Sequence, residues 1–339
     1  MTLRLPLFFA GLAVGFLPFS ASAQPPAVPR ALSVDETEGV MVPLPPDSDT
    51  DTQLRIQIYL DERNFGPGNL DGRIGEFGKK AASVYNQINN IAVGNYGPLI
   101  ERSAKAVPQP YTTYTIKEGD LVFVTPGMPG KPSLQAKTKY LGYTELMEFV
   151  SERFHTSEEF LMKINAGKNF NTLKPGSILK VPNVKPFEIE NWAKYVQFKP
   201  EEPATSHAVV VDIKARVAIF FDDKNKPIAS FPITPGQPKF IKFGEWKVTN
   251  MVSTPTFRWD KSMLEEGRRS SSFYELPIGP NNPVGIMWCG TSRSGIGLHG
   301  TNNPLTIGRA ESHGCIRLAN WDAVRLPTLL RPGSRVVIR

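Results

Sequence analysis

The chain has 339 residues, 40% of them hydrophobic, and this length excludes a single small domain, so we expect two or more. The formal net charge is +7, and the residues from His207 onward hold eighteen Lys and Arg against ten Asp and Glu. This basic C-terminal part indicates an anionic polymer or acidic peptides as partner, or else a solvated basic surface.

The first 23 residues, MTLRLPLFFAGLAVGFLPFSASA, place Arg4 before an apolar run and end in a small-residue Ala-Ser-Ala site. This pattern predicts a secretory signal peptide over 1–23 and a mature protein that starts at Gln24. The apolar run contains Pro18 and is shorter than the roughly 20 residues of a membrane span, with a retained anchor as the alternative. We therefore expect an exported protein of the periplasm or cell envelope, with no stable membrane span and no nucleic acid partner.

Residues 24–50 are rich in proline and acidic residues and have no helical or strand period, which predicts an extended tether. From Asp51, apolar residues recur at helical spacing on both sides of the turn FGPGNLDGRIG, which predicts a small helical domain over 51–105. The order of these residues and the DGRIGE turn resemble the three-helix peptidoglycan-binding domain of bacterial wall hydrolases. A plain helical hairpin is the alternative interpretation.

Residues 106–187 begin with the strand-like YTIKEGD, pass through two short stretches of helical spacing, and end in LKPGSILKVP, a predicted turn and strand. Both ends resemble a LysM glycan-binding module, and the segment after the first strand is longer than is usual in that family. The prediction is a small α+β LysM-like domain with an insertion, or alternatively a spacer between domains. Residues 188–204 are a predicted linker.

Residues 205–339 contain six short β-branched and aromatic runs: HAVVVDI, RVAIFF, PIASFPIT, EWKVTNMV, VGIMWC and SRVVIR. Gly, Pro, Asn and Asp separate these runs, and few long helical patterns compete with them, which predicts an all-β sandwich or barrel. The expected fold class is therefore multidomain, a mainly β domain preceded by a small helical domain and a small α+β domain.

The stretch GIGLHGTNNPLTIGRAESHGCIRLANW holds two of the four histidines and one of the two cysteines. Cys315 follows Gly314, which lets the backbone turn so that the N–H groups of both residues converge as an oxyanion hole. An unperturbed thiol has a pKa of roughly 8.5, and an imidazole partner, His299 or His313, would raise the thiolate fraction and return a proton to the leaving group. The favoured interpretation is nucleophilic catalysis by Cys315.

Two other interpretations of these residues stay open at the level of sequence. The first is a zinc site, with four possible ligands that contain no C-x-x-C pair: Cys289, His299, His313 and Cys315. The second is a structural disulfide between Cys289 and Cys315, which an oxidising compartment would permit. Cys289 by itself is interpreted as a small buried hydrophobe, or as a thiol that caps Cys315 under oxidation. We expect no metal and no other cofactor.

GLHGT followed by SHGCIRL resembles the signature of the L,D-transpeptidase family, whose catalytic unit is the YkuD-type β-domain, and the resemblance covers 205–339. It implies a cysteine nucleophile at Cys315, a general base at His299 held by the carbonyl of Gly300, and an oxyanion hole near His313, Gly314 and Cys315. Five further residues are assigned to substrate binding: Ser312, Arg317, Trp259, Tyr274 and Thr301.

The implied reaction is acyl transfer on the stem tetrapeptide of peptidoglycan. The thiol would attack after the diamino acid, release the terminal D-alanine and pass the acyl group to an amine of a second stem. Water as acceptor would give a carboxypeptidase or endopeptidase, and a lipoprotein as acceptor would give wall attachment. A non-catalytic wall-binding protein is the alternative of a different class. The expected partners are glycan strands, stem peptides and, in the attachment case, lipoproteins, with the upstream domains raising the local concentration of wall.

Overall fold

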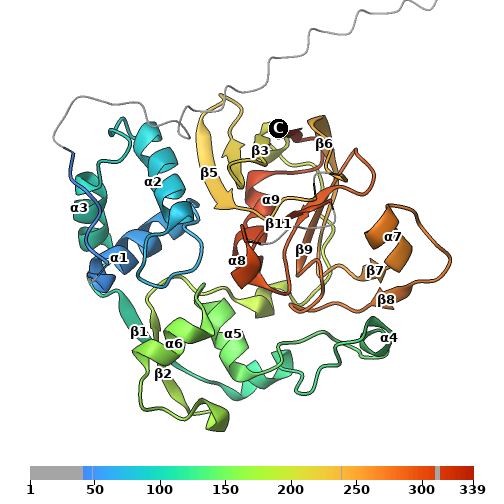
Figure 1. Ribbon diagram of the computed structural model, residues 1–339, viewed down its shortest axis with the longest axis horizontal. Helices are drawn as coiled ribbons and strands as arrows, with labels where there is room; N and C mark the ends of the chain where they lie inside the picture. The colour runs from blue at the N-terminus through green and yellow to red at the C-terminus, as the bar shows by residue number, and fades with distance from the viewer. Residues whose placement is uncertain (1–40, 48, 238, 310–313) are drawn as a thin grey trace, which may run out of the picture.

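The computed structural model describes residues 41–47, 49–237, 239–309 and 314–339. The predicted signal peptide, most of the predicted tether, and the predicted site residues Ser312 and His313 lie outside the described residues. The described chain forms a helical part, a small α+β part and a β-rich C-terminal part (Figure 1). Within these ranges, no helix has the length and apolar character that crossing a membrane requires.

The helical part comprises α1 (Thr50–Asp61), α2 (Glu76–Ile88) and α3 (Gly97–Ala106). Asp49 caps α1, because its carboxylate accepts the backbone N–H of Thr52 at 3.1 Å. The glycine-rich turn between α1 and α2 closes around the buried side chain of Gln57, which donates to Asp71 Oδ1 at 3.0 Å and accepts from the N–H of Gly72 at 2.8 Å. One buried amide therefore fixes the whole turn.

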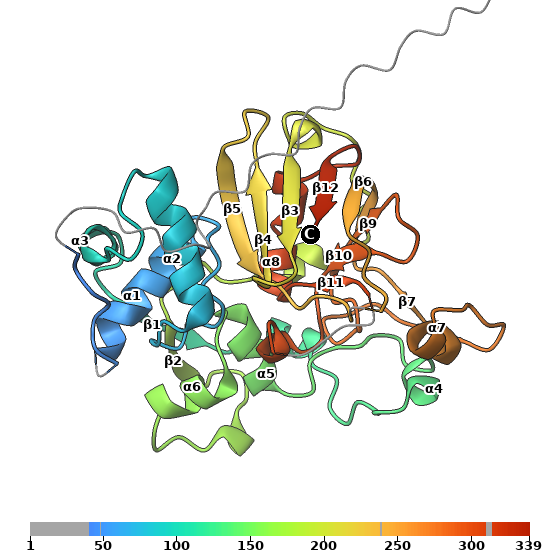
Figure 2. The ribbon, with the colours of Figure 1, turned by 45° about the horizontal axis from the view of Figure 1, so that its top comes forward.

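The middle part is built on an antiparallel pair, β1 (Tyr111–Thr115) and β2 (Ile178–Pro182). Its helices are α4 (Pro132–Gln135), α5 (Leu146–Arg153) and α6 (Glu158–Ile164), with 3-10 turns at η2 (Glu118–Phe123) and η3 (Phe170–Thr172). The predicted insertion, between β1 and α5, extends away from this pair and brings α4 beside strand β8 of the C-terminal part (Figures 1 and 2). Two more 3-10 turns, η4 (Ile189–Trp192) and η5 (Ala204–Ser206), lie in the predicted linker and at its end.

The C-terminal part contains one eight-stranded sheet with the order β11-β10-β9-β6-β12-β3-β4-β5 (Figure 2). Its strands are β3 (Ala208–Asp212), β4 (Val217–Phe221), β5 (Pro227–Pro232), β6 (Gly244–Ser253), β9 (Met287–Thr291), β10 (Gly297–His299), β11 (Ile316–Arg317) and β12 (Arg335–Ile338). The β10–β11 and β12–β3 pairs are parallel and the other pairs are antiparallel. The six predicted strand runs correspond to six of these strands, and the very short β10 and β11 are additional.

The sheet is curled, because strands at its two ends share one hydrophobic core. Phe231 of β5 and Ile316 of β11 belong to the same buried cluster, together with Leu326 of α9. The helices α8 (Asn320–Ala323) and α9 (Leu326–Leu329) contribute apolar side chains to this cluster. The predicted all-β fold is thus a single curled sheet, and not two stacked sheets.

A segment at residues 256–283, which we call the cover segment, leaves the sheet between β6 and β9. It carries β7 (Phe257–Trp259), α7 (Lys261–Glu266) and β8 (Tyr274–Leu276), and it projects from the sheet at the right of Figure 1. The buried carboxylate of Asp260 holds it together by capping α7 at the N–H of Met263 and by accepting the N–H and hydroxyl of Ser270 at 2.8 and 2.9 Å.

All three parts meet at a buried cluster of charged side chains. Asp61 at the end of α1 accepts hydrogen bonds from Arg325 Nη2 at 2.7 Å and from His155 Nδ1 at 3.1 Å. Asp61 and His155 are 1% and 3% exposed. These contacts hold the pKa of Asp61 below its usual range against the opposing effect of burial. The helical, middle and C-terminal parts are therefore packed together through a desolvated ion pair.

Candidate active site

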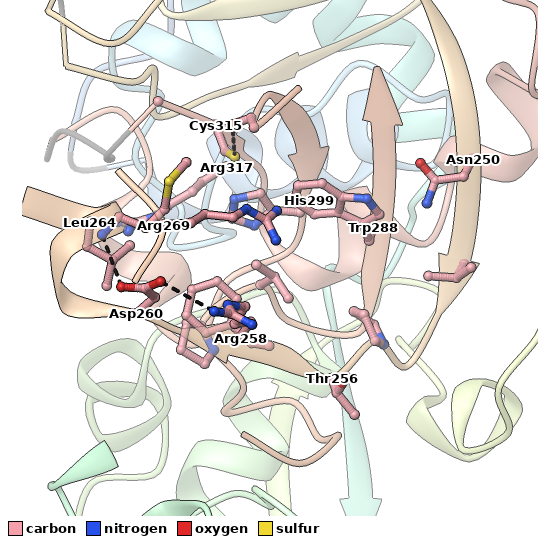
Figure 3. A pocket seen from close by; sticks show the side chains of 18 of the residues that line it. Asn250, Thr256, Arg258, Asp260, Leu264, Arg269, Trp288, His299, Cys315 and Arg317 are labelled. Atoms are coloured by element: carbon pink, nitrogen blue, oxygen red, sulfur yellow. Dashed lines mark hydrogen bonds and ion pairs between the residues drawn. The ribbon is translucent and has the colours of Figure 1, made fainter. Parts of the chain in front are cut away.

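The neighbouring strands β9, β10 and β11 place Trp288, His299 and Arg317 side by side. In the antiparallel β9–β10 pair His299 is opposite Trp288, and in the parallel β10–β11 pair it is opposite Arg317. Because side chains alternate along a strand, Cys315, two residues before Arg317, is directed to the same face. Figure 3 shows Cys315, Arg317, His299 and Trp288 grouped on the wall of one pocket.

The opposite face of the same strands is apolar. Cys289, Leu298 and Ile316 occupy neighbouring strand positions, and all three are fully buried in the core of the curled sheet. Cys289 therefore lies across the sheet from Cys315, and both residues are thiols. This geometry contradicts the disulfide interpretation and removes Cys289 from the possible zinc ligands, since both would need Cys289 and Cys315 on one face. Burial also raises the pKa of Cys289 to about 12.

The pocket has a volume of about 460 Å³. Four of the predicted site residues line it: Cys315, His299, Gly314 and Arg317. Other lining residues were not predicted: Tyr195 from the linker, Asn250 and Val252 from β6, Trp288 from β9, and Arg258, Asp260, Met263, Leu264 and Arg269 from the cover segment. The cover segment thus forms one wall of the pocket and the sheet forms the other (Figure 3).

His299 is oriented by a backbone carbonyl and an indole ring. Its Nδ1 lies 2.6 Å from the oxygen of Gly300, and because a carbonyl only accepts, Nδ1 carries the proton and Nε2 keeps its lone pair. The imidazole stacks on Trp288 with ring centroids 5.6 Å apart. Burial lowers the pKa of His299 to about 3, a direction that the nearby Arg317 charge reinforces and the Gly300 hydrogen bond opposes. His299 is therefore a neutral base at physiological pH.

Cys315 is half-buried, and its Sγ donates to the carbonyl of Gly295 at 3.4 Å. Desolvation raises the pKa of the thiol to about 11, although the backbone N–H of Gly297 and the Arg317 charge both favour the thiolate. The resting pocket thus holds a neutral thiol and a neutral imidazole. Burial of both groups thus opposes the thiolate that an imidazole partner is expected to favour.

Gly314, the residue before Cys315, makes a close backbone approach to Gly236. Gly314 has φ +154°, and a Cβ at Gly236 would lie 2.4 Å from the Cα of Gly314. Thr234 and Arg317 flank this contact and exchange backbone hydrogen bonds of 3.0 and 2.9 Å. The glycine of the TPG sequence is therefore required because only a residue without a side chain lets the two segments touch.

Positive charge is concentrated on the pocket. Arg317, Arg258 and the exposed Arg269 line it, against the single buried carboxylate of Asp260. The Arg258 guanidinium lies 3.4 Å from the centroid of the Phe273 ring, donates to the carbonyl of Ser270 at 2.7 Å and is 3.7 Å from Asp260. The pocket is therefore electrostatically suited to anionic groups.

Three residues assigned to substrate binding do not line this pocket. Trp259 and Tyr274 are opposite each other in the β7–β8 pair, and their rings pack together with centroids 5.8 Å apart. Thr301 is buried, with its N–H bound to Asn320 Oδ1 at 3.2 Å. Of the unpredicted lining residues, Trp288 could have been found by strand alternation, because it precedes the core residue Cys289. Arg258 directly precedes Trp259, which was assigned to substrate binding.

A pocket that pairs a cysteine thiol with a neutral, oriented histidine is suited to thiol-dependent acyl transfer. The family model of the L,D-transpeptidase catalytic domain, YkuD, matches residues 206–338. The YkuD protein of Bacillus licheniformis, named as an L,D-transpeptidase, is 24% identical over 57% of this chain and 93% of its own. YkuD of Bacillus subtilis is 46% identical over 17% of this chain and 36% of its own, and YbiS of Escherichia coli is 26% identical over 58% and 60%. Both are also named as L,D-transpeptidases.

Among solved structures, L,D-transpeptidase 3 from Mycobacterium tuberculosis is similar over 50% of this chain and 76% of its own, with 14% identity and a TM-score of 0.32. The chain spans nearly the full length of the B. licheniformis relative, but less than two thirds of the B. subtilis and E. coli relatives. From the sequence matches, residues 206–338 are an L,D-transpeptidase catalytic domain, the domain of an acyltransferase enzyme family.

Proposed function

We propose that this chain is an exported L,D-transpeptidase that acts on peptidoglycan stem tetrapeptides through a thioester on Cys315. The observation that carries the proposal is the shared pocket of Cys315 and His299, in which Nδ1 is bound to Gly300 and Nε2 is left as the base. In this proposal the helical part and the middle part contact the wall, as their resemblance to peptidoglycan-binding and LysM modules implies.

In the first half-reaction, Sγ of Cys315 attacks the carbonyl carbon that joins the diamino acid to the terminal D-alanine. His299 Nε2 takes the thiol proton as the C–S bond forms, because neither group is ionised at rest. The oxyanion develops beside Gly314 and Cys315, the predicted donors. The imidazolium then protonates the leaving nitrogen, the C–N bond breaks, D-alanine departs, and the rest of the stem stays as a thioester.

In the second half-reaction an amine of another stem attacks the thioester, His299 removes the amine proton, and Cys315 leaves as the thiol. Water at about 55 M competes for the same thioester, so transfer requires an acceptor at high effective molarity and restricted water. The cover segment supports transfer because it forms one wall of the pocket. Arg258, Arg269 and Arg317 are suited to hold the carboxylates of the stems.

The test is incubation of the purified protein with disaccharide tetrapeptide, followed by mass spectrometry of the products. Release of D-alanine with dimers joined through the two diamino acids would support the transpeptidase. Tripeptide alone would favour a carboxypeptidase, and a lipoprotein adduct in envelope extracts would favour wall attachment. Cys315→Ala should abolish every product, whereas the matched Cys289→Ala variant should keep them. Activity of the Cys315→Ala variant would overturn the mechanism. Loss of the parent protein's activity in EDTA, with rescue by zinc, would also overturn it.

A further inference from the structure

A carboxyl group of the middle part is hydrogen-bonded to a buried side chain of the catalytic domain. Glu152, near the end of α5, is only 4% exposed, and its Oε1 accepts the side-chain amide of Asn320 at 2.8 Å and the hydroxyl of Tyr143 at 3.1 Å. Asn320, at the start of α8 in the catalytic domain, is completely buried. One buried hydrogen bond therefore joins two parts of the chain.

Asn320 in turn holds the segment that orients His299. Its Oδ1 accepts the N–H of Thr301 at 3.2 Å, and its Nδ2 donates to the carbonyl of Thr301 at 3.0 Å. The contact with the preceding residue is closer still, because a Cβ at Gly300 would lie 2.1 Å from Asn320 Oδ1. Gly300 is the residue whose carbonyl fixes the His299 tautomer. Any rotation of the Asn320 amide would therefore displace Gly300, whose carbonyl orients His299.

The middle part also braces the end of the cover segment. The N–H of Leu141 donates to the carbonyl of Ile278 at 2.8 Å, and the carbonyl of Leu141 accepts the N–H of Asn281 at 2.9 Å. Gly279 has φ +142°, and a Cβ there would lie 2.2 Å from the Leu141 oxygen. The predicted insertion thus ends in a backbone contact with the catalytic domain. Two residues later in the chain, the hydroxyl of Tyr143 donates to Glu152.

Hydrogen-bond accounting makes Glu152 one of the groups that set the orientation of the Asn320 amide, and the one that comes from outside the catalytic domain. The amide has one oxygen and two N–H donors, and flipping it would direct the NH₂ group at the N–H of Thr301. The N–H groups of Thr301 and Ile286 donate to the amide oxygen, and the carbonyls of Thr301 and Pro280 accept from its NH₂ group. Glu152 Oε1 is the shortest acceptor of that NH₂ group, at 2.8 Å, and supports the same orientation. Burial raises the pKa of Glu152 to about 8, so its carboxyl is mainly protonated at neutral pH, and glutamine is a close mimic of it.

We propose that Glu152 is a positioning residue of the active site, which acts through Asn320 to hold Gly300 and hence the His299 imidazole in its working orientation. The middle part then belongs to the catalytic unit, in addition to the wall contact proposed for it. This inference rests on the proposed acyl transfer at Cys315, because His299 is taken as the base of that reaction.

The experiment compares Glu152→Leu, which fills the space without an acceptor, with Glu152→Gln, which keeps the acceptor. Tyr114→Phe is the matched control, because it removes the buried hydrogen bond to Asp120, at 2.7 Å, in the same part without touching Asn320. D-Alanine release from soluble disaccharide tetrapeptide gives kcat and KM. We expect kcat of Glu152→Leu to fall by about tenfold to a hundredfold with KM within about threefold, and both other variants to stay within about threefold of the parent.

A second readout does not depend on turnover, namely the imidazole N–H proton resonance of His299 in NMR spectra of the full chain. It should shift or broaden in Glu152→Leu and stay in place in Glu152→Gln and Tyr114→Phe. An unshifted resonance with unchanged kcat in a folded Glu152→Leu protein would overturn the inference. Equal losses in the Leu and Gln variants would also overturn it, since the acceptor would then be irrelevant.

Should Glu152→Leu not fold, Glu152→Met gives the same decision. Methionine keeps an unbranched side chain of similar length but has no oxygen to accept the Asn320 amide, and it leaves the hydrogen bonds between Asn320 and Thr301 in place. A shifted His299 resonance supports the inference, and a parent-like resonance and kcat overturn it. Failure of the parent protein itself to release D-alanine would instead refute the proposed function, while the resonance would still report on the Glu152 contact.

Discussion

Titration of Cys315 by alkylation tests the neutral character of the resting site. The pKa of about 11 leaves a thiolate fraction of about 10⁻⁴ at pH 7, since the pH is about four units below the pKa. An unperturbed thiol of pKa roughly 8.5 has about 3% thiolate at the same pH. Cys315 should therefore react with a small neutral alkylating agent about two orders of magnitude more slowly than cysteine in an unfolded peptide.

The assay is the rate of iodoacetamide labelling at Cys315, followed by mass spectrometry between pH 6 and 10.5 in a Cys289→Ala background. The rate should rise about tenfold per pH unit and show no plateau in this range. Turnover should behave differently, because the pKa of His299 is lowered to about 3 and its imidazole stays unprotonated down to that pH. D-Alanine release should thus persist at pH 5. A labelling plateau that begins near pH 6, together with loss of turnover below pH 6.5, would refute the reasoning and indicate a thiolate–imidazolium pair.

Three other predictions follow from the packing. Arg325→Met should lower the free energy of unfolding by about 3–5 kcal/mol, because it leaves the buried Asp61 carboxylate without its cation. In urea unfolding, adding Asp61→Asn to this variant should recover part of the lost stability, and strictly additive effects of the two substitutions would contradict their coupling. Cys289 should stay a thiol after mild oxidation, so a disulfide to Cys315 in peptide mass spectra would show that the sheet face opens. Deleting residues 51–187 should reduce kcat on soluble tetrapeptide as well as on intact sacculi, because the deletion removes buried contacts to the catalytic domain. A loss of activity on sacculi alone would mean that these residues only tether the enzyme to the wall.

The structure places four of the predicted site residues in one pocket, and the sequence could bring them together because they are close in the chain. Cys315 and His299 stand in one stretch, and the expected hydrogen bond between His299 and the carbonyl of Gly300 is a contact between neighbours. The six long strands were also predicted, because each carries a β-branched or aromatic run. In contrast, β10 and β11 have only three and two residues, too few for a periodic pattern, and they exist through pairing with neighbouring strands.

Contacts between distant segments account for what the sequence does not predict. Glu152 and Asn320 are 168 residues apart, and no local pattern indicates that they share a hydrogen bond. Trp259 and Tyr274 were assigned to substrate binding, but they face each other across the β7–β8 pair and do not line the pocket. The raised pKa of Cys315 likewise depends on the desolvating pocket wall and not on the residues beside it in the chain.

The packing around Asn320 limits which chimeric proteins can be built from this catalytic domain. Its side-chain oxygen would meet a Cβ at Gly285 at 2.0 Å and one at Gly300 at 2.1 Å, so the three positions can only change together. Its amide nitrogen also depends on an acceptor from outside the catalytic domain. A catalytic domain transplanted alone into another protein would therefore lose the acceptor of one side-chain N–H group of Asn320. Engineers who build chimeras should carry the middle part along with it, or install a new acceptor beneath α8.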